Sequence, residues 1–123
     1  MAVNVLGTPL KVCSTDPMTG WFRNGCCETG KGDRGLHLVC CRVTEEFLEH
    51  QRSIGNDLMT PMPAYRFPGL RPGDQWCVCV TRWVESMEAG FACPIDLEAT
   101  HISTLEFVSL DDLQRHSVGG STA

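Results

Sequence analysis

The chain has 123 residues, a length that suits one domain and leaves little room for a second. Hydrophobic residues make up 42% of the chain and charged residues 20%, which excludes an intrinsically disordered protein. The formal net charge of −5 argues against a nucleic-acid partner, because nucleic-acid-binding proteins usually carry a basic face. No apolar run approaches the roughly 20 residues of a membrane span, so we expect no membrane partner either.

The start of the chain has no basic stretch followed by an apolar one, the pattern typical of an export signal. We therefore expect a cytoplasmic protein whose eight cysteines are mostly reduced. Cysteines in that state are buried small hydrophobes, metal ligands or reactive thiols. These three roles define the alternatives for function.

The N-terminal part of the chain combines strand patterns with turns. Residues 9–14 predict a short strand, and Asn24 with Gly25 predicts a tight hairpin turn, because both residues accept positive φ angles. Residues 30–35 match the dinucleotide-binding pattern GxGxxG, but a hairpin precedes them and a strand follows, so we predict a flexible loop. Residues 36–43 are almost all apolar or β-prone and predict a buried strand.

A helix and a long irregular segment are expected next. Thr44 is the predicted N-cap, Glu45 and Glu46 suit the first turn, and Gly55 ends the helix. Residues 55–74 contain four prolines and three glycines, which exclude a helix or a central strand. Such a segment packs on the domain either as a lid or wall of a site or as an ordered cover over the sheet.

The remaining predicted elements are short. Ser109 with Asp112 three residues later resembles a capping box that opens the last helix. The elements are, in chain order, a strand over 75–83, a helix over 84–89, a strand over 95–100, a helix or turn over 101–107, a helix ending near 116, and a flexible tail over 117–123. We expect a single α+β domain over residues 4–116, a two-layer sandwich. It has a small antiparallel or mixed sheet, short helices on one face and a long Pro/Gly-rich loop.

The cysteine pattern predicts a possible zinc site. No two cysteines have the CxxC spacing of a redox pair or a zinc knuckle. In strand geometry Cys26 and Cys27 point to opposite faces, and Cys40 and Cys41 do the same, so at most one of each pair serves a given site. His37 and Cys40 are an odd number of residues apart and should also face opposite ways. A tetrahedral zinc site would then use Cys13, Cys27 or Cys26, Cys40, and one of Cys77, Cys79 and His37.

Buried free thiols are the alternative to a metal site, and a cysteine nucleophile is a third one. A nucleophile needs a neighbouring imidazolium or a helix N-terminus, and the candidate partners are His37 and His101. Glu98 and His101 lie where a predicted strand enters a helix, a common place for general acid–base or ligand-binding groups. Capping or a surface ion pair is the favoured alternative for these two residues. Whether the protein is an enzyme stays open.

A binding pocket is the leading functional hypothesis. We expect it between the loop over 55–74, the strand over 75–83 and the end over 98–101, with space for a small ligand, for example an anion. Asn56 and Asp57 stand at the mouth of the loop, although Asx turns that hold the loop's own backbone are favoured for them. The candidate ligand-binding residues are Asn56, Asp57, Arg82, Glu98 and His101, with surface charge as the favoured alternative for the arginine.

Several stretches taken in order resemble a known family. They include PMTGWFRNGCC, GLHLVCCRVTEEFLEH, GNDLMTP, FPGLRPGDQWCVC and LEATH, and together they resemble the bacterial domain-of-unknown-function family 2237 from about Asn4 to His116. The resemblance implies a compact two-layer α+β fold in the bacterial cytoplasm, without an assigned activity, catalytic residue or cofactor. Cys41 departs from the pattern, where a small apolar residue is usual. The shared positions are Cys13, Cys27, His37, Cys40, Asn56, Asp57, Cys77, Cys79, Glu98 and His101.

Overall fold

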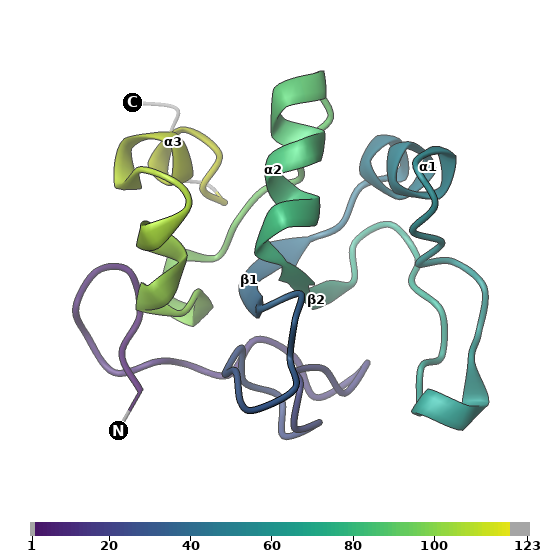
Figure 1. Cartoon of the computed structure of the whole chain (residues 1–123), viewed down its shortest axis with the longest axis horizontal. Coiled ribbons are helices and arrows are strands. Elements are labelled where there is room, and N and C mark those ends of the chain that lie inside the picture. Colours follow the sequence, from purple (N-terminus) through teal and green to yellow (C-terminus); the bar gives the residue numbers. More distant parts are fainter. Residues whose placement is uncertain (1, 119–123) are drawn as a thin grey trace.

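The computed structural model of the chain describes residues 2–118. Its elements are, in chain order, β1 (His37–Arg42), α1 (Glu45–Ser53), η1 (Pro63–Tyr65), β2 (Gln75–Cys79), α2 (Val80–Ala89), η2 (Leu97–Ala99), η3 (Ile102–Glu106) and α3 (Leu110–Arg115), where η marks a 3₁₀ helix (Figure 1). Strands β1 and β2 pair in antiparallel orientation, with Cys40 opposite Cys77. The predicted α+β fold with a small sheet is confirmed, and the sheet is antiparallel.

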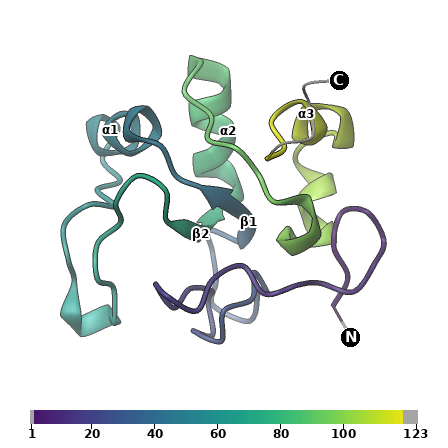
Figure 2. The same cartoon turned by 180° about the vertical axis from the view of Figure 1, so that it is seen from behind.

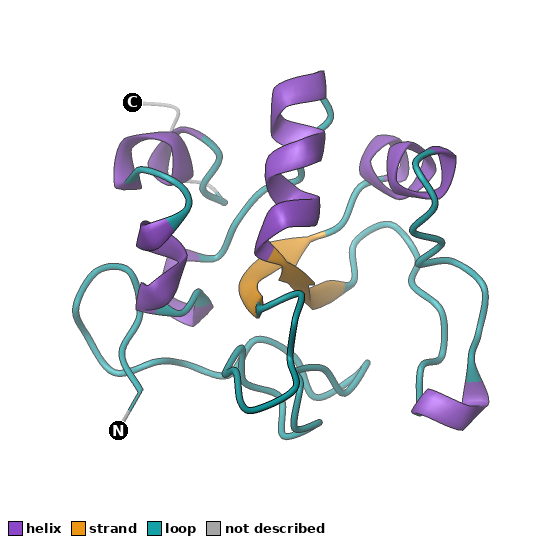
Figure 3. Ribbon diagram, in the orientation of Figure 1, coloured by secondary structure: helices purple, strands orange, loops and turns teal. Residues whose placement is uncertain are grey.

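The helices and the N-terminal segment lie on opposite sides of this sheet. Two opposite views show α1, α2 and α3 on one side and the N-terminal segment on the other (Figure 1, Figure 2). The orange strands of Figure 3 lie between the α-helices and the teal N-terminal loops. The predicted arrangement of short helices on one face is therefore confirmed. No helix among residues 2–118 is long and apolar enough to span a membrane.

The sheet divides its side chains between two buried clusters, because successive residues of a strand point to opposite faces. Val39 and Cys41 of β1 belong to the main core. That core also contains Phe47 of α1 and Trp83 of α2, both fully buried. Each such aromatic side chain contributes roughly 2–3 kcal/mol to folding. Cys40 belongs to a second cluster on the other face, so the prediction that Cys40 and Cys41 face opposite ways is confirmed.

The strand predicted over 75–83 is shorter than expected. It ends at Cys79, and α2 begins at Val80, whose N–H donates to the Leu36 carbonyl at 3.1 Å. Val80 and Trp83 are three residues apart and both fully buried, so they lie on the same face of a helix. The indole N–H of Trp83 also donates to the Cys93 carbonyl at 3.1 Å. Packing of this helical face therefore overrides the β propensity of the segment.

Two other predicted strands are wrong. Residues 9–14 form no named strand, and their backbone bonds go to unrelated segments, for example from Lys11 N–H to the Glu98 carbonyl. Residues 95–100 contain only isolated bridges at Ile95, followed by the 3₁₀ turn η2. The predicted hairpin around Gly25 is a series of turns, although Gly25 does have the expected positive φ of 89°. The backbone N–H and C=O groups of these segments form hydrogen bonds with other parts of the chain, several of them distant in the sequence. The pattern of hydrophobic residues does not reveal such partners.

The predicted starts of α1 and α3 are confirmed, whereas the helix predicted over 84–89 begins earlier, at Val80. The Thr44 hydroxyl accepts the Phe47 N–H at 3.2 Å at the start of α1. The Ser109 hydroxyl accepts the Asp112 N–H at 3.1 Å at the start of α3. The predicted tail divides in two: residues 117 and 118 pair with Ile95, and residues 119–123 lie outside the described part of the chain.

The long segment over 55–74 covers one side of the domain. Phe67 and Leu70 are buried, and the ring of Phe67 meets that of Trp76 on β2 edge-on with centroids 5.1 Å apart. The Leu70 N–H donates to the Leu58 carbonyl at 2.8 Å, which brings the two arms of the segment together. The segment thus packs against the core as an ordered cover, one of its two predicted roles.

Candidate functional site

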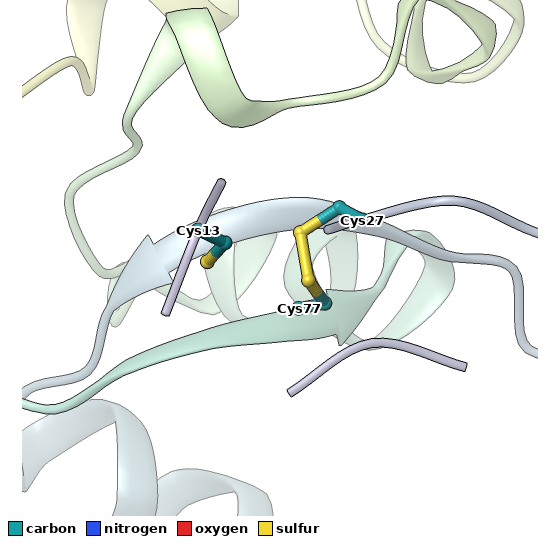
Figure 4. A group of neighbouring side chains, drawn as sticks. All are labelled: Cys13, Cys27 and Cys77. Carbon is teal, nitrogen blue, oxygen red and sulfur yellow. A yellow bond between two sulfur atoms is a disulfide. The ribbon is translucent and has the colours of Figure 1, made fainter. Parts of the chain in front are cut away.

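Four cysteines meet on the sheet face opposite the α-helices. Cys40 of β1 lies opposite Cys77 of β2, and Cys13 and Cys27 reach them from the N-terminal segment. Figure 4 shows the sulfur of Cys13 beside the disulfide that joins Cys27 and Cys77. All four residues are buried, with at most 6% of any of them exposed. They form a compact sulfur cluster, which we call the four-cysteine cluster.

The four-cysteine cluster contains two disulfides, Cys13–Cys40 and Cys27–Cys77. Their Cα atoms are 5.7 and 5.3 Å apart, within the range that a disulfide requires. The sulfur atoms of Cys13, Cys27 and Cys77 all lie within 4.8 Å of one another. The expectation of mostly reduced thiols therefore fails for these four residues. The free cysteines are Cys26, Cys41, Cys79 and Cys93.

Polar groups support the four-cysteine cluster from two sides. The side-chain amide of Gln75 donates to the Cys13 carbonyl at 2.7 Å and lies 3.6 Å from the Cys40 sulfur. The Thr19 hydroxyl, fully buried, accepts the Cys77 N–H at 2.9 Å. Gln75 thus directs an N–H donor toward sulfur, an arrangement that stabilises negative charge on a thiolate.

Cys26 and Cys41 lie outside the cluster, so each adjacent pair contributes only one cysteine to it, as predicted. Cys26 is half-buried; burial raises the pKa of its thiol, and the charge of Glu28 raises it further. Cys41 is in the main core, where burial first and then a hydrogen bond with Cys93 raise the pKa of its thiol well above the usual value. Both thiols are therefore protonated near neutral pH.

The other two metal-ligand candidates, Cys79 and His37, lie next to each other but outside the four-cysteine cluster. The Cys79 sulfur is 3.3 Å from Nε2 of His37. Nδ1 of His37 is 2.6 Å from Oδ1 of Asp33, whose side chain is fully buried. Burial raises the pKa of the Cys79 thiol to about 11, the charge of Asp33 also raises it, and the charge of Arg82 and a backbone N–H lower it. Cys79 therefore holds its proton near neutral pH.

Sequence reasoning missed Asp33. Its signal was an acid four residues before His37, inside the GxGxxG stretch that predicted only a flexible loop. The irregular register between His37 and Val39 also escaped prediction. It places His37 directly opposite Cys79, so the odd spacing from Cys40 does not decide which way the imidazole points.

The loop candidates have different surroundings. Asn56 lines a cavity of about 60 Å³ together with His37 and Cys79. Its side chain donates to Oε1 of Gln51 at 2.9 Å. Asp57 accepts the N–H groups of Met59 at 2.8 Å and Thr60 at 3.2 Å, the favoured Asx-turn role. The hydrogen bond from the Thr60 hydroxyl is the main cause that lowers the pKa of the Asp57 carboxyl.

The remaining ligand-binding candidates pair with near neighbours. Arg82 contacts Glu85 at 3.2 Å, and Glu98 contacts Lys11 at 3.1 Å. Nδ1 of His101 accepts the Ser103 N–H at 3.0 Å and caps η3, and burial lowers the pKa of His101. These are the ion-pair and capping roles that the sequence favoured.

The predicted single pocket is divided between two edges of the sheet. The covering loop packs on β2 through Trp76, whereas the chain around Ile95 bridges to Cys41 on β1. Glu98 accordingly lines a separate pocket of about 370 Å³ with Arg42. Asn56 and Glu98 therefore line two different pockets.

Residues 3–117 match the family DUF2237, described as an uncharacterized protein conserved in bacteria. The chain belongs to this family. No curated protein matches this DUF2237 chain at a significant level.

Proposed function

We propose that this DUF2237 protein is a redox-responsive zinc-binding protein and that its zinc ligands are Cys13, Cys27, Cys40 and Cys77. In the reduced state the four sulfurs hold one zinc ion, and in the oxidised state they form the two disulfides. The observation that carries the proposal is the distance of at most 4.8 Å among the sulfurs of Cys13, Cys27 and Cys77, with Cys40 bonded to the first of them.

Geometry makes the two states mutually exclusive. Tetrahedral zinc binds thiolate sulfur at about 2.3 Å, which places neighbouring sulfurs about 3.8 Å apart. A disulfide holds its two sulfurs only about 2 Å apart. Reduction frees all four sulfurs, and those of Cys13, Cys27 and Cys77 already lie within 4.8 Å of one another. Cys40, now bonded to Cys13, would turn its side chain toward these three to complete the site. Four ligands from separate segments form a closed site of the structural type.

The chemistry balances with a dithiol as the reductant. Each disulfide takes two electrons and two protons, and two dithiol molecules become two cyclic disulfides. The four thiols then lose their protons to solvent as zinc binds, and the site carries a net charge of about −2. The amide of Gln75, 3.6 Å from the Cys40 sulfur, donates toward this charge. Zinc thus binds only the reduced protein and holds the four cysteines together in that state.

Metal content of the purified protein tests the proposal. We expect about one zinc per chain after anaerobic reduction with dithiothreitol and addition of zinc, and almost none in the untreated disulfide form. Substitution of cobalt for zinc should give the strong thiolate-to-metal charge-transfer absorption of a sulfur-ligated site. Failure of the reduced protein to take up either metal would contradict the proposal.

Two matched variants separate the site from general thiol binding. Cys27→Ser should lower the zinc affinity at least about tenfold, because it removes one of four ligands. Cys26→Ser alters the next residue, which is free and lies outside the cluster, and should bind zinc like the unsubstituted protein. If Cys27→Ser folds poorly, the cobalt spectrum of the unsubstituted chain still reports the number of sulfur ligands. An equal loss of zinc affinity in the two variants would overturn the assignment of Cys27 as a ligand.

A further inference from the structure

A second cysteine lies in a hydrogen-bonded series with a histidine and a carboxylate. The Cys79 sulfur is 3.3 Å from Nε2 of His37, and Nδ1 of His37 is 2.6 Å from Oδ1 of Asp33. An ionised carboxylate accepts the Nδ1 proton, which leaves the lone pair of Nε2 for the thiol proton. Nucleophile, base and orienting group thus follow in the order that nucleophilic catalysis requires.

The carboxylate of Asp33 is held firmly in this position. Its Oδ1 also accepts the Leu36 N–H at 3.1 Å. Its Oδ2 accepts the His37 N–H and the Thr29 hydroxyl, each at 3.0 Å. The side chain is fully buried, so these donors replace the water that would otherwise solvate the charge. The group that orients His37 is therefore itself immobilised.

Two features of the backbone bring the thiol and the imidazole together. The register irregularity in β1 puts His37 directly opposite Cys79, and bulges of this kind often re-aim a side chain next to a site. Gly35 provides the room, because a Cβ at that position would lie 2.5 Å from the Cys79 sulfur. The glycine-rich loop thus supplies both the carboxylate and the space for the nucleophile.

A small cavity opens beside the pair. It measures about 60 Å³ and is lined by both residues together with Asn56, Leu58 and Trp76, among others. That volume equals roughly two water molecules at about 30 Å³ each. Its walls are polar and apolar in about equal parts, and the Asn56 amide is one of the polar groups. It fits a small acyl group such as acetyl, with a larger leaving group left in solvent.

We propose that Cys79 is a catalytic nucleophile toward small acyl groups, with His37 as its general base and Asp33 as a positioning residue for the imidazole. The two sites are neighbours, because Cys77 also lines this cavity, but neither Cys79 nor His37 belongs to the four-cysteine cluster.

The reaction balances as the hydrolysis of an activated ester or thioester. The Cys79 sulfur attacks the carbonyl carbon as His37 Nε2 takes the thiol proton. The bond to the leaving oxygen or sulfur breaks, and His37 returns the proton to it. Water then attacks the enzyme thioester and gives its proton to His37. The carboxylic acid departs, and the proton restores the thiol.

Acetylation by p-nitrophenyl acetate tests the proposal in the full chain with its disulfides intact. We expect acetyl transfer to Cys79 at least about 100-fold faster than to Cys26, since general-base catalysis contributes that much or more. Cys26 is the matched control because it is free and half-buried. Peptide mapping by mass spectrometry locates the acetyl group, and release of nitrophenolate beyond one equivalent reports hydrolysis. Equal rates at the two cysteines would overturn the proposal.

Variants of the base give a second, independent test. His37→Ala should lower the acetylation rate of Cys79 at least about 100-fold, and added imidazole should restore part of it. Recovery by imidazole also shows that the variant is folded. A His37→Ala protein that acetylates Cys79 at the original rate would contradict the role of His37.

The roles of Asp33 and Gly35 are tested with measurements that would not change if these residues only supported the fold. In the NMR spectrum we expect a strongly downfield Nδ1 proton of His37, absent in Asp33→Asn, together with slower acetylation. Gly35→Ala keeps all three reacting groups but crowds the sulfur, and should slow acetylation while the downfield proton remains. An unchanged downfield proton in Asp33→Asn would overturn the positioning role.

Discussion

Single side chains in this protein combine a local structural role with a chemical one. His101 illustrates this, because its Nδ1 accepts the Ser103 N–H and so caps η3. Such acceptance requires an unprotonated nitrogen. The cap and the protonation state of the imidazole are therefore linked.

We expect His101 to make the folded protein less stable as the pH is lowered. Burial lowers the pKa of this residue, and the charge of Glu28 opposes the shift only in part. The unfolded chain therefore binds a proton near pH 6.5 that the folded chain binds only at lower pH, so stability rises with pH across this range and is lost below it. Urea denaturation between pH 7.5 and about 5 measures the effect.

A variant isolates the contribution of this one residue. His101→Asn keeps a side-chain acceptor but does not titrate, so it should lose less stability on acidification than the unsubstituted chain does. The remaining histidines are common to both proteins and cancel in the comparison. An identical acid dependence in the two proteins would show that His101 has no part in it.

At the scale of elements, side-chain capping marks where α1 and α3 begin. The Thr44 hydroxyl accepts the Phe47 N–H at the start of α1. The negative charges of Glu45 and Glu46 in the first turn also interact favourably with the helix dipole. This helix presents Phe47 and Leu48 to the core, so a loose first turn would disturb packing directly.

We expect Thr44→Ala to lower the free energy of unfolding by about 1 kcal/mol, the usual cost of a lost N-cap. Thr44→Ser retains the accepting oxygen and should remain close to the unsubstituted protein. Urea denaturation at neutral pH, followed by circular dichroism, gives both values. Equal losses in the two variants would point to the methyl group instead of the hydroxyl.

For the whole molecule, the four-cysteine cluster joins the N-terminal segment to the sheet. The two disulfides close loops with sequence separations of 27 and 50 residues. Loop entropy alone assigns about 3.5 and about 4 kcal/mol to such cross-links taken singly, and less than the sum to both because the loops overlap. On the face of the sheet that carries Cys40 and Cys77, the buried apolar cluster of the described residues consists of these four cysteines and Ala99.

Reduction without metal should therefore destabilise the fold by several kcal/mol, and zinc should restore much of the loss. Urea midpoints of the oxidised, reduced and zinc-loaded reduced protein measure both effects. Cys26→Ser serves as the control and should behave like the unsubstituted chain in all three states. A reduced, metal-free protein as stable as the oxidised one would show that the cluster does not support the fold.

Local sequence determined the caps, the two strands and the alternation along them. Thr44 and Ser109 could be recognised because a cap depends on residues only three positions apart. Strand alternation likewise separated Cys40 from Cys41, and it limited a zinc site to one of each adjacent pair. Cys13, Cys27, Cys40 and Cys77 were all among the predicted ligands, and the structure brings these four together.

Only the tertiary structure decided which groups meet across the chain. The irregular register in β1 places His37 opposite Cys79, and the burial of Asp33 completes that series. Neither leaves a periodic signal, because a bulge adds one residue and a loop carboxylate follows no repeat. The end of β2 at Cys79 was also hidden, since the burial of Trp83 against other elements outweighs local β propensity. The sequence therefore determined the residue types and local elements, whereas long-range packing decided how they combine into sites.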